Sequence, residues 1–137
     1  MRSQGIPIRR VTARLRGDRG QAAIEFTGMV PVILATLVLL WQAVLVGYTF
    51  SLAGNAADEA ARAGTVARGE RDAACKRAGR EHLPAAWLGA AVFECSSSGD
   101  DLFTARVQLR VPVLFPGSVN FPFSVDGSAS AADEAAR

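Results

Sequence analysis

An uncharged, apolar stretch in the first half of the chain constrains the fold more than any other feature. No charged residue occurs from Phe26 to Leu52, and Met29 to Phe50 is apolar without a polar stripe at helical spacing. About 20 such residues in a helix, at 1.5 Å per residue, span the roughly 30 Å hydrocarbon core of a bilayer. The stretch therefore predicts a transmembrane helix. Trp41 lies in the middle of it, where we expect a packing role.

Charge is distributed unevenly on the two sides of this stretch. The 137-residue chain has a formal net charge of +2. Residues 1–20 hold six arginines and one acid, a balance of +5, whereas residues 26–137 hold nine basic and eleven acidic groups, a balance of −2. Basic residues favour the cytoplasmic side of a membrane helix, so we expect the N-terminus in the cytoplasm and the C-terminal part outside. The arginines are interpreted as this topology signal, and we expect no nucleic-acid partner.

A cleaved secretory signal peptide is a competing interpretation of the same stretch. Such peptides have an apolar region of about 7 to 15 residues followed by small residues at the cleavage site. Ser51 and Ala53 have the right sizes and spacing for such a site. The apolar stretch is too long for this class, however, so a membrane helix that is retained fits better.

The junction between the basic segment and the apolar stretch holds a single acid. Gly20 ends the basic segment, Gln21 follows it, and Glu25 stands directly before Phe26 at the edge of the apolar stretch, with Pro31 six residues further on. A carboxylate inside a membrane helix costs about 2.5 to 3.5 kcal/mol on insertion scales. Glu25 therefore requires either a partner charge or a position in the headgroup region, near the favourable end of the helix dipole.

These junction residues resemble the class III leader of type IV pilins and, more narrowly, the opening of the TadE-like pseudopilins of tight-adherence (Flp, type IVc) pilus systems. In that family a Glu-Phe pair and a proline six residues after the glutamate recur, here as Glu25, Phe26 and Pro31. The resemblance implies that a prepilin peptidase cuts between Gly20 and Gln21. It also implies that Glu25 recognises a neighbouring subunit.

The resemblance further implies a minor pilin, because residue 21 is Gln where many type IVa pilins have Phe, and Phe26 lacks the following tyrosine of the major Flp pilins. Such a protein is a non-enzymatic structural subunit that acts in the assembly of a tight-adherence pilus or a related secretion system. Its implied partners are the membrane, the prepilin peptidase, other pilins and pseudopilins, and the pilus assembly platform proteins. It is first held as a single-pass protein in the cytoplasmic membrane and then enters the filament or primes its assembly. The alternative is a permanent single-pass envelope protein with a retained leader and a small extracytoplasmic binding domain.

The chain after the apolar stretch changes from helical to strand periodicity. We expect the first helix to continue to about residue 68, a second helix from Glu70 to Leu83, a loop over the Ser/Gly/Asp cluster from Ser96 to Asp101, and strands at Ala91–Cys95, Phe103–Val111 and Phe121–Ala131, the last of them at an edge. This order predicts an α+β, pilin-like fold with a small antiparallel sheet. The predicted parts are a basic leader (residues 1–20), a transmembrane helix (21–53) and an extracytoplasmic domain (54–137).

The two cysteines lie on the side of the membrane where disulfides persist. Cys75 belongs to the expected second helix and Cys95 to the end of the first expected strand. We favour a bridge between them over two free buried thiols. It would close a loop of about 20 residues, worth on the order of 3 kcal/mol in the chain-entropy model.

The sequence contains little for catalysis or for binding a metal or cofactor. His82 is the single histidine, and a lone histidine without convergent partners defines no site. A closed zinc site takes four nitrogen or sulfur ligands. We therefore expect no enzyme, no metal site and no cofactor, a surface position for His82, and core positions for Trp87 and Phe93.

Overall fold

The structure is a computed structural model that describes residues 17–98 and 101–133. In chain order its elements are α1 (Gly17–Val66), α2 (Arg71–Glu81), α3 (Ala85–Leu88), β1 (Val92–Ser98), β2 (Leu102–Val113) and β3 (Val119–Ala132). These helices and the antiparallel sheet confirm the predicted α+β class. The chain divides into two compact units, residues 1–39 and 40–137.

The first helix has slightly different limits from those predicted. It already includes Gly17, the first residue that the structure describes, four residues before the expected start. It ends at Val66, and Gly69 then adopts a φ of +117°, which glycine accepts readily and which helps to turn the chain into α2. Residues 1–16 of the predicted leader lie outside the described residues.

In the first unit, α1 carries its large apolar side chains in the open. Ile24, Phe26 and Met29 are more than 60% exposed, and Pro31 lies inside the helix. The candidate membrane span begins at Ala23, and its most apolar 18-residue window is 6% buried. A helix this apolar and this little covered by protein fits a single-pass membrane protein.

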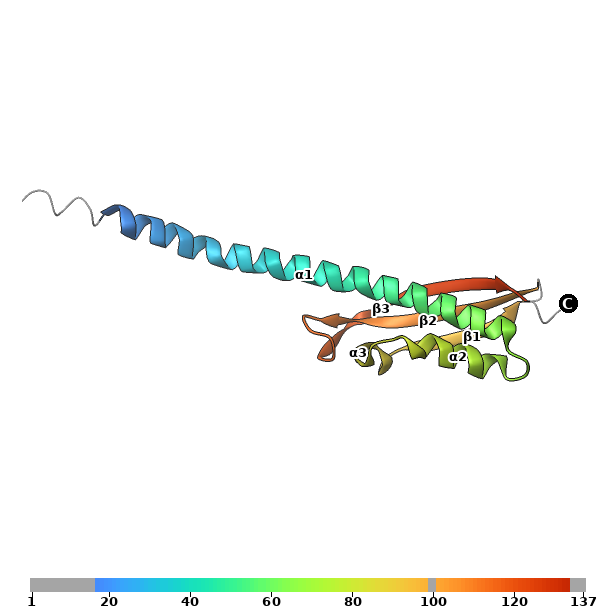
Figure 1. Ribbon diagram of the computed structural model, residues 1–137. Coiled ribbons are helices and arrows are strands. Elements are labelled where there is room, and N and C mark those ends of the chain that lie inside the picture. Colours follow the sequence, from blue (N-terminus) through green and yellow to red (C-terminus); the bar gives the residue numbers. More distant parts are fainter. Residues whose placement is uncertain (1–16, 99–100, 134–137) are drawn as a thin grey trace, which may run out of the picture. The chain divides into compact units, whose positions relative to one another are not determined.

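In the second unit, α1, α2 and α3 lie on one face of the sheet (Figure 1). The strand order is β1-β2-β3, and both pairs are antiparallel, so β3 is an edge strand as predicted. Along β2 the predicted alternation is confirmed, with Phe103, Ala105, Val107, Leu109 and Val111 all buried. The residues between them are half-buried or exposed, which leaves a polar face opposite the helices.

Two details of the sheet correct the predictions. The loop expected from Ser96 onward is shorter, because β1 runs to Ser98 and pairs there with Leu102. Pro112 belongs to β2, at a register shift in its pairing with β3. The β1 pairing ends at Gln108, so no β1 residue pairs with Pro112, and proline's missing N–H removes no ladder hydrogen bond on that side.

Small residues let the helices approach the sheet closely. A Cβ added at Gly127 of β3 would lie 2.3 Å from the carbonyl carbon of Ala53, so only glycine fits against α1 there. A Cβ at Gly79 of α2 would lie 2.7 Å from the ring of Phe93. The core therefore uses close backbone approach, with Phe93 filling the space that Gly79 leaves.

The short helix α3 brings a tryptophan to the α1 side of the core. Trp87 is 5% exposed, as the sequence predicted, and its indole Nε1 donates a 3.1 Å hydrogen bond to the Thr49 hydroxyl. Its ring meets Tyr48 edge-on, with 5.5 Å between the centroids. Burial is acceptable because the indole N–H has a partner. This contact helps to hold α1 and α3 together.

Candidate functional site

The junction residues all lie on the first unit's part of α1. The peptide bond between Gly20 and Gln21 lies on α1, three residues after Gly17, the first residue that the structure describes. Phe26 is 66% exposed. Pro31 is exposed and interrupts the backbone hydrogen bonds of the helix, because proline has no N–H. The sequence therefore placed these residues on one helical segment, as the structure has them.

Glu25 is the one acid of the described chain on this segment outside the basic end. Its side chain is exposed, and it forms no ion pair with any residue that the structure describes. The next acid along the chain is Asp58, in the second unit. Glu25 thus presents a carboxylate that is available to a partner from outside the chain.

Polar side chains of this apolar segment are bonded within their own helix. The Thr27 hydroxyl donates to the carbonyl of Ala23 at 2.8 Å, and the Thr36 hydroxyl donates to Val32 at 2.9 Å. A hydroxyl paired in this way can face hydrocarbon at low cost, since its hydrogen bond is already made. The segment suits an apolar surrounding, except at Glu25.

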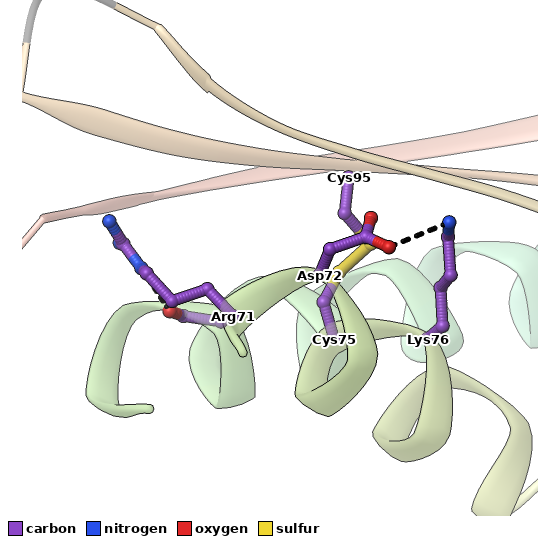
Figure 2. Close-up of a disulfide and its surroundings, with 6 residues drawn as sticks. Arg71, Asp72, Cys75, Lys76 and Cys95 are labelled. Carbon is purple, nitrogen blue, oxygen red and sulfur yellow. Dashed lines mark hydrogen bonds and ion pairs between the residues drawn. A yellow bond between two sulfur atoms is a disulfide. The ribbon is translucent and has the colours of Figure 1, made fainter. Parts of the chain in front are cut away.

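The cysteines join α2 to β1. The Sγ atoms of Cys75 and Cys95 are bonded, and Figure 2 shows Cys75 reaching from α2 toward Cys95 on the strand. Cys75 is buried and Cys95 is half-buried. The structure thus has the predicted disulfide and not the two free thiols. The disulfide joins residues 20 positions apart, and in the chain-entropy model it stabilises the fold by about 3 kcal/mol.

Arg71 connects the start of α2 to the end of α1 and to the residue after β3. This role was not predicted from the sequence. The Nε of Arg71 donates to the carbonyl of Gly64 at 2.8 Å, and its Nη1 pairs with Asp133 at 2.7 Å. The guanidinium also lies 4.9 Å from the centroid of the Phe103 ring. The only sequence signal was an arginine after a glycine turn, because Asp133 is 62 residues away.

Two side chains of α1 bind the end of β2, and the sequence analysis missed this contact as well. The Trp41 indole Nε1 donates to the carbonyl of Leu114 at 2.6 Å. The Gln42 amide donates to the carbonyl of Pro112 at 2.9 Å and accepts from the N–H of Leu114 at 3.1 Å. Trp41 is also 49% exposed, and the packing role expected for it stays a prediction.

A shallow groove between α1 and α2 is lined by several charged or titratable side chains, which makes it a candidate binding site. Asp58, Glu59, Arg62 and His82 line it, with His82 exposed as predicted. Within residues 17–98 and 101–133, no three His, Cys, Asp or Glu side chains gather closely enough to hold a metal ion. The groove thus has charged side chains, but among the described residues they do not form a metal-binding site.

Comparison with known proteins identifies the segment that carries the junction. Residues 20–62 match the TadE-like protein family. The match begins at the glycine of the junction and includes Glu25, Phe26 and Pro31, which confirms the resemblance seen in the sequence. Searches of curated proteins and of solved structures found no significant match.

The TadE-like segment covers the first unit's helix and continues into the second unit. It ends at Arg62, four residues before α1 ends. The match connects the chain with functions of tight-adherence (Flp) pilus systems and with the membrane. The sheet and α2 lie outside the TadE-like segment.

Proposed function

We propose that this protein is a minor pilin, a non-enzymatic structural subunit that acts in assembling a tight-adherence pilus or a related secretion system. One observation carries the proposal. The TadE-like segment has a charge-free helix with one exposed carboxylate at its edge, and a glycine five residues before that carboxylate. A simple membrane anchor does not need Glu25, whereas an assembling subunit does.

The glycine marks the processing point in this proposal. A prepilin peptidase on the cytoplasmic side cuts between Gly20 and Gln21, which removes 20 of the 137 residues and leaves 117. The cut also removes six arginines that would otherwise hold the N-terminus in the cytoplasm. It leaves a free amino group on Gln21, a cation at neutral pH.

The carboxylate of Glu25 then becomes the recognition group. The Gln21 amine of one subunit approaches Glu25 of its neighbour when the helices pack with a stagger. Each charge is expensive in lipid by itself, so the pair is favoured over two separate charges. The exposed large side chains around Glu25, such as Phe26 and Met29, exchange lipid contacts for contacts with other helices.

The protein is located in the cytoplasmic membrane before assembly, with its N-terminus in the cytoplasm and its sheet outside. The distribution of charge supports this orientation, and the disulfide between Cys75 and Cys95 suits an oxidising compartment. The partners in this proposal are the prepilin peptidase, other pilins and pseudopilins, and the assembly platform proteins. The chemistry requires no metal or cofactor.

Intact-mass analysis of two glycine variants tests the processing step. In a host with the matching peptidase, the wild-type protein should have the mass of residues 21–137, while Gly20→Leu should keep all 137 residues. Gly28→Leu is the matched control, because Gly28 is also on α1 and nothing lies within 4 Å of a Cβ at either position. It should be cut normally. A wild-type protein that retains Arg2 to Arg19 in that host would instead indicate a permanent membrane anchor.

A further inference from the structure

The hairpin between β2 and β3 has an apolar tip without any charge. The hairpin tip, defined as residues 112–123, lies within a charge-free stretch that runs from Val111 to Val125. Its large apolar side chains are exposed: Phe115 by 67%, Val119 by 71%, Phe123 by 47% and Leu114 by 40%. Exposed apolar residues gathered at one point of a small domain usually mark a contact with a membrane or a partner.

The backbone of the hairpin tip satisfies much of its hydrogen bonding by itself. The N–H of Phe115 donates to Val113 at 2.6 Å, and the N–H of Ser118 donates to Phe115 at 3.2 Å. The Ser118 hydroxyl oxygen lies 2.8 Å from the carbonyl of Val113 and 2.7 Å from that of Phe115, and its single hydrogen is shared between these two acceptors. Pro112, Pro116 and Pro122 contribute no N–H. A tip with these internal bonds loses less when it leaves water.

Leu114 adopts a backbone conformation that leucine rarely has. Its φ is +61°, a region that glycine and asparagine occupy far more easily. Its carbonyl accepts from Trp41 and its N–H donates to Gln42, so α1 holds both of its polar backbone groups. An apolar side chain thus occupies a turn position where a polar residue would be less strained.

The same bonds fix the hairpin tip at a known point along α1. Trp41 is sixteen residues after Glu25 and 21 residues after Gly20. At 1.5 Å per residue, at most about 24 Å of helix separates Glu25 from Trp41, and about 32 Å separates Gly20 from Trp41. The hydrocarbon core is about 30 Å thick, and any tilt of the helix shortens the vertical distance. With Glu25 at the cytoplasmic boundary Trp41 lies inside the hydrocarbon, and with Gly20 there Trp41 lies at about its outer boundary.

We propose that the hairpin tip is a second membrane contact, which inserts into the acyl-chain and headgroup boundary of the outer leaflet beside the transmembrane helix. This inference rests on the proposed membrane-spanning role of α1. Two observations select lipid as the occupant: the tip is bonded to α1 at a point about one hydrocarbon thickness or less from the cytoplasmic boundary, and its exposed side chains are uncharged. Trp41 then stands among aromatic residues at the interface, where tryptophan is favoured.

The second contact gives the sheet domain a fixed height and orientation on the membrane before assembly. The hairpin tip and α1 enter the bilayer together, because Gln42 and Trp41 bond the two. A subunit that moves into a filament must withdraw both. The apolar tip is then freed for contacts that the membrane-held subunit does not make.

Lipid quenching of an introduced tryptophan tests the proposal on the full chain. Phe115→Trp and Val66→Trp are each reconstituted in phosphatidylethanolamine and phosphatidylglycerol vesicles, with or without bromine on the acyl chains near the headgroups of both leaflets. Val66 is the matched control, since it is 68% exposed in the same unit and lies 25 residues beyond Trp41 on α1. The native Trp41 and Trp87 contribute equally to both variants.

We expect the emission added by the Phe115→Trp substitution to be largely lost in brominated vesicles, whereas the emission added by Val66→Trp should persist. Equal persistence of both signals would overturn the proposal. Shielding of the indole in Phe115→Trp that occurs only after other pilins are added, without quenching by lipid, would also overturn it and assign the tip to a protein partner. The vesicles contain no pilus component, so the result does not depend on whether the chain assembles into a pilus.

Discussion

The two parts of α1 differ in which side chains they expose and which they bury. In the first unit, large side chains such as Ile24 and Leu39 are more than 70% exposed. In the second unit, Ala53, Ala57 and Ala60 are fully buried against the sheet domain. The difference shows that α1 meets the sheet domain mainly through small residues, which allow a close approach. The larger apolar residues are in the part whose surface remains available to lipid or to other helices.

Removing the disulfide should have the largest effect, and it should affect the second unit alone. We expect the double variant Cys75→Ser, Cys95→Ser to lose about 3 kcal/mol of unfolding free energy, because the unfolded chain regains the freedom of a 20-residue loop. Denaturant unfolding of the full chain in detergent, followed by the circular dichroism of the sheet, measures this. Membrane fractionation serves as the control and should be unchanged. Equal stability with and without the bridge would contradict the prediction.

Replacing a glycine by alanine should affect stability very differently in the two units. Gly127→Ala should destabilise the sheet by roughly 3 kcal/mol, the upper end for overpacking, because the added Cβ meets the backbone of Ala53, which cannot rotate away. Gly28→Ala adds the same atom to the first unit's helix, where nothing lies within 4 Å of it. Thermal unfolding of both variants gives the comparison. Similar losses in the two would show that the close approach at Gly127 is not needed.

Removing a threonine hydroxyl should also lower the free energy of unfolding in the second unit but not in the first. Thr49→Val should cost about 1 kcal/mol, because the buried Trp87 indole N–H loses its acceptor. Thr36→Val removes a hydroxyl that bonds only to Val32 of its own helix, so we expect almost no change in the unfolding of the sheet. Chemical unfolding of the two variants decides the matter, and a smaller loss for Thr49→Val than for Thr36→Val would contradict it.

The elements that depend on the pattern of neighbouring residues in the chain could be predicted from the sequence. The alternation from Phe103 to Val111 gives β2 because a strand has a period of two. The uncharged stretch gives the apolar part of α1, because about 20 apolar residues in a helix match the thickness of a bilayer. The junction around Glu25 was recognised by its resemblance to the TadE-like family, and the family match covers it. The membrane limits of the predicted span, residues 21–53, stay a prediction; the second unit begins at Leu40.

Contacts between distant parts of the chain could not be predicted in this way. Arg71 meets Asp133 across 62 residues, and Trp41 meets Leu114 across 73. Neither pair has a spacing or composition that marks it. The predicted second strand ended at Val111, whereas β2 includes Pro112, because propensity does not show that β1 ends before it reaches that position. In each case the three-dimensional neighbours decide the outcome.

The central claim is that the exposed carboxylate in the first unit is an assembly group, whereas exposed acids in the second unit are not. Glu25→Ala and Asp58→Ala remove one exposed acid from each unit. Membrane insertion should persist in both variants, and Glu25→Ala should insert at least as well as the wild type, since a charge leaves the apolar helix.

Co-purification with the other pilins from membranes of a host that carries the pilus system measures this claim most directly. Asp58→Ala should retain the pilins at wild-type levels. Glu25→Ala should lose them while it is still cut after Gly20 and still fractionates with the membrane. A Glu25→Ala protein that is processed, inserted and co-purified like the wild type would contradict the account.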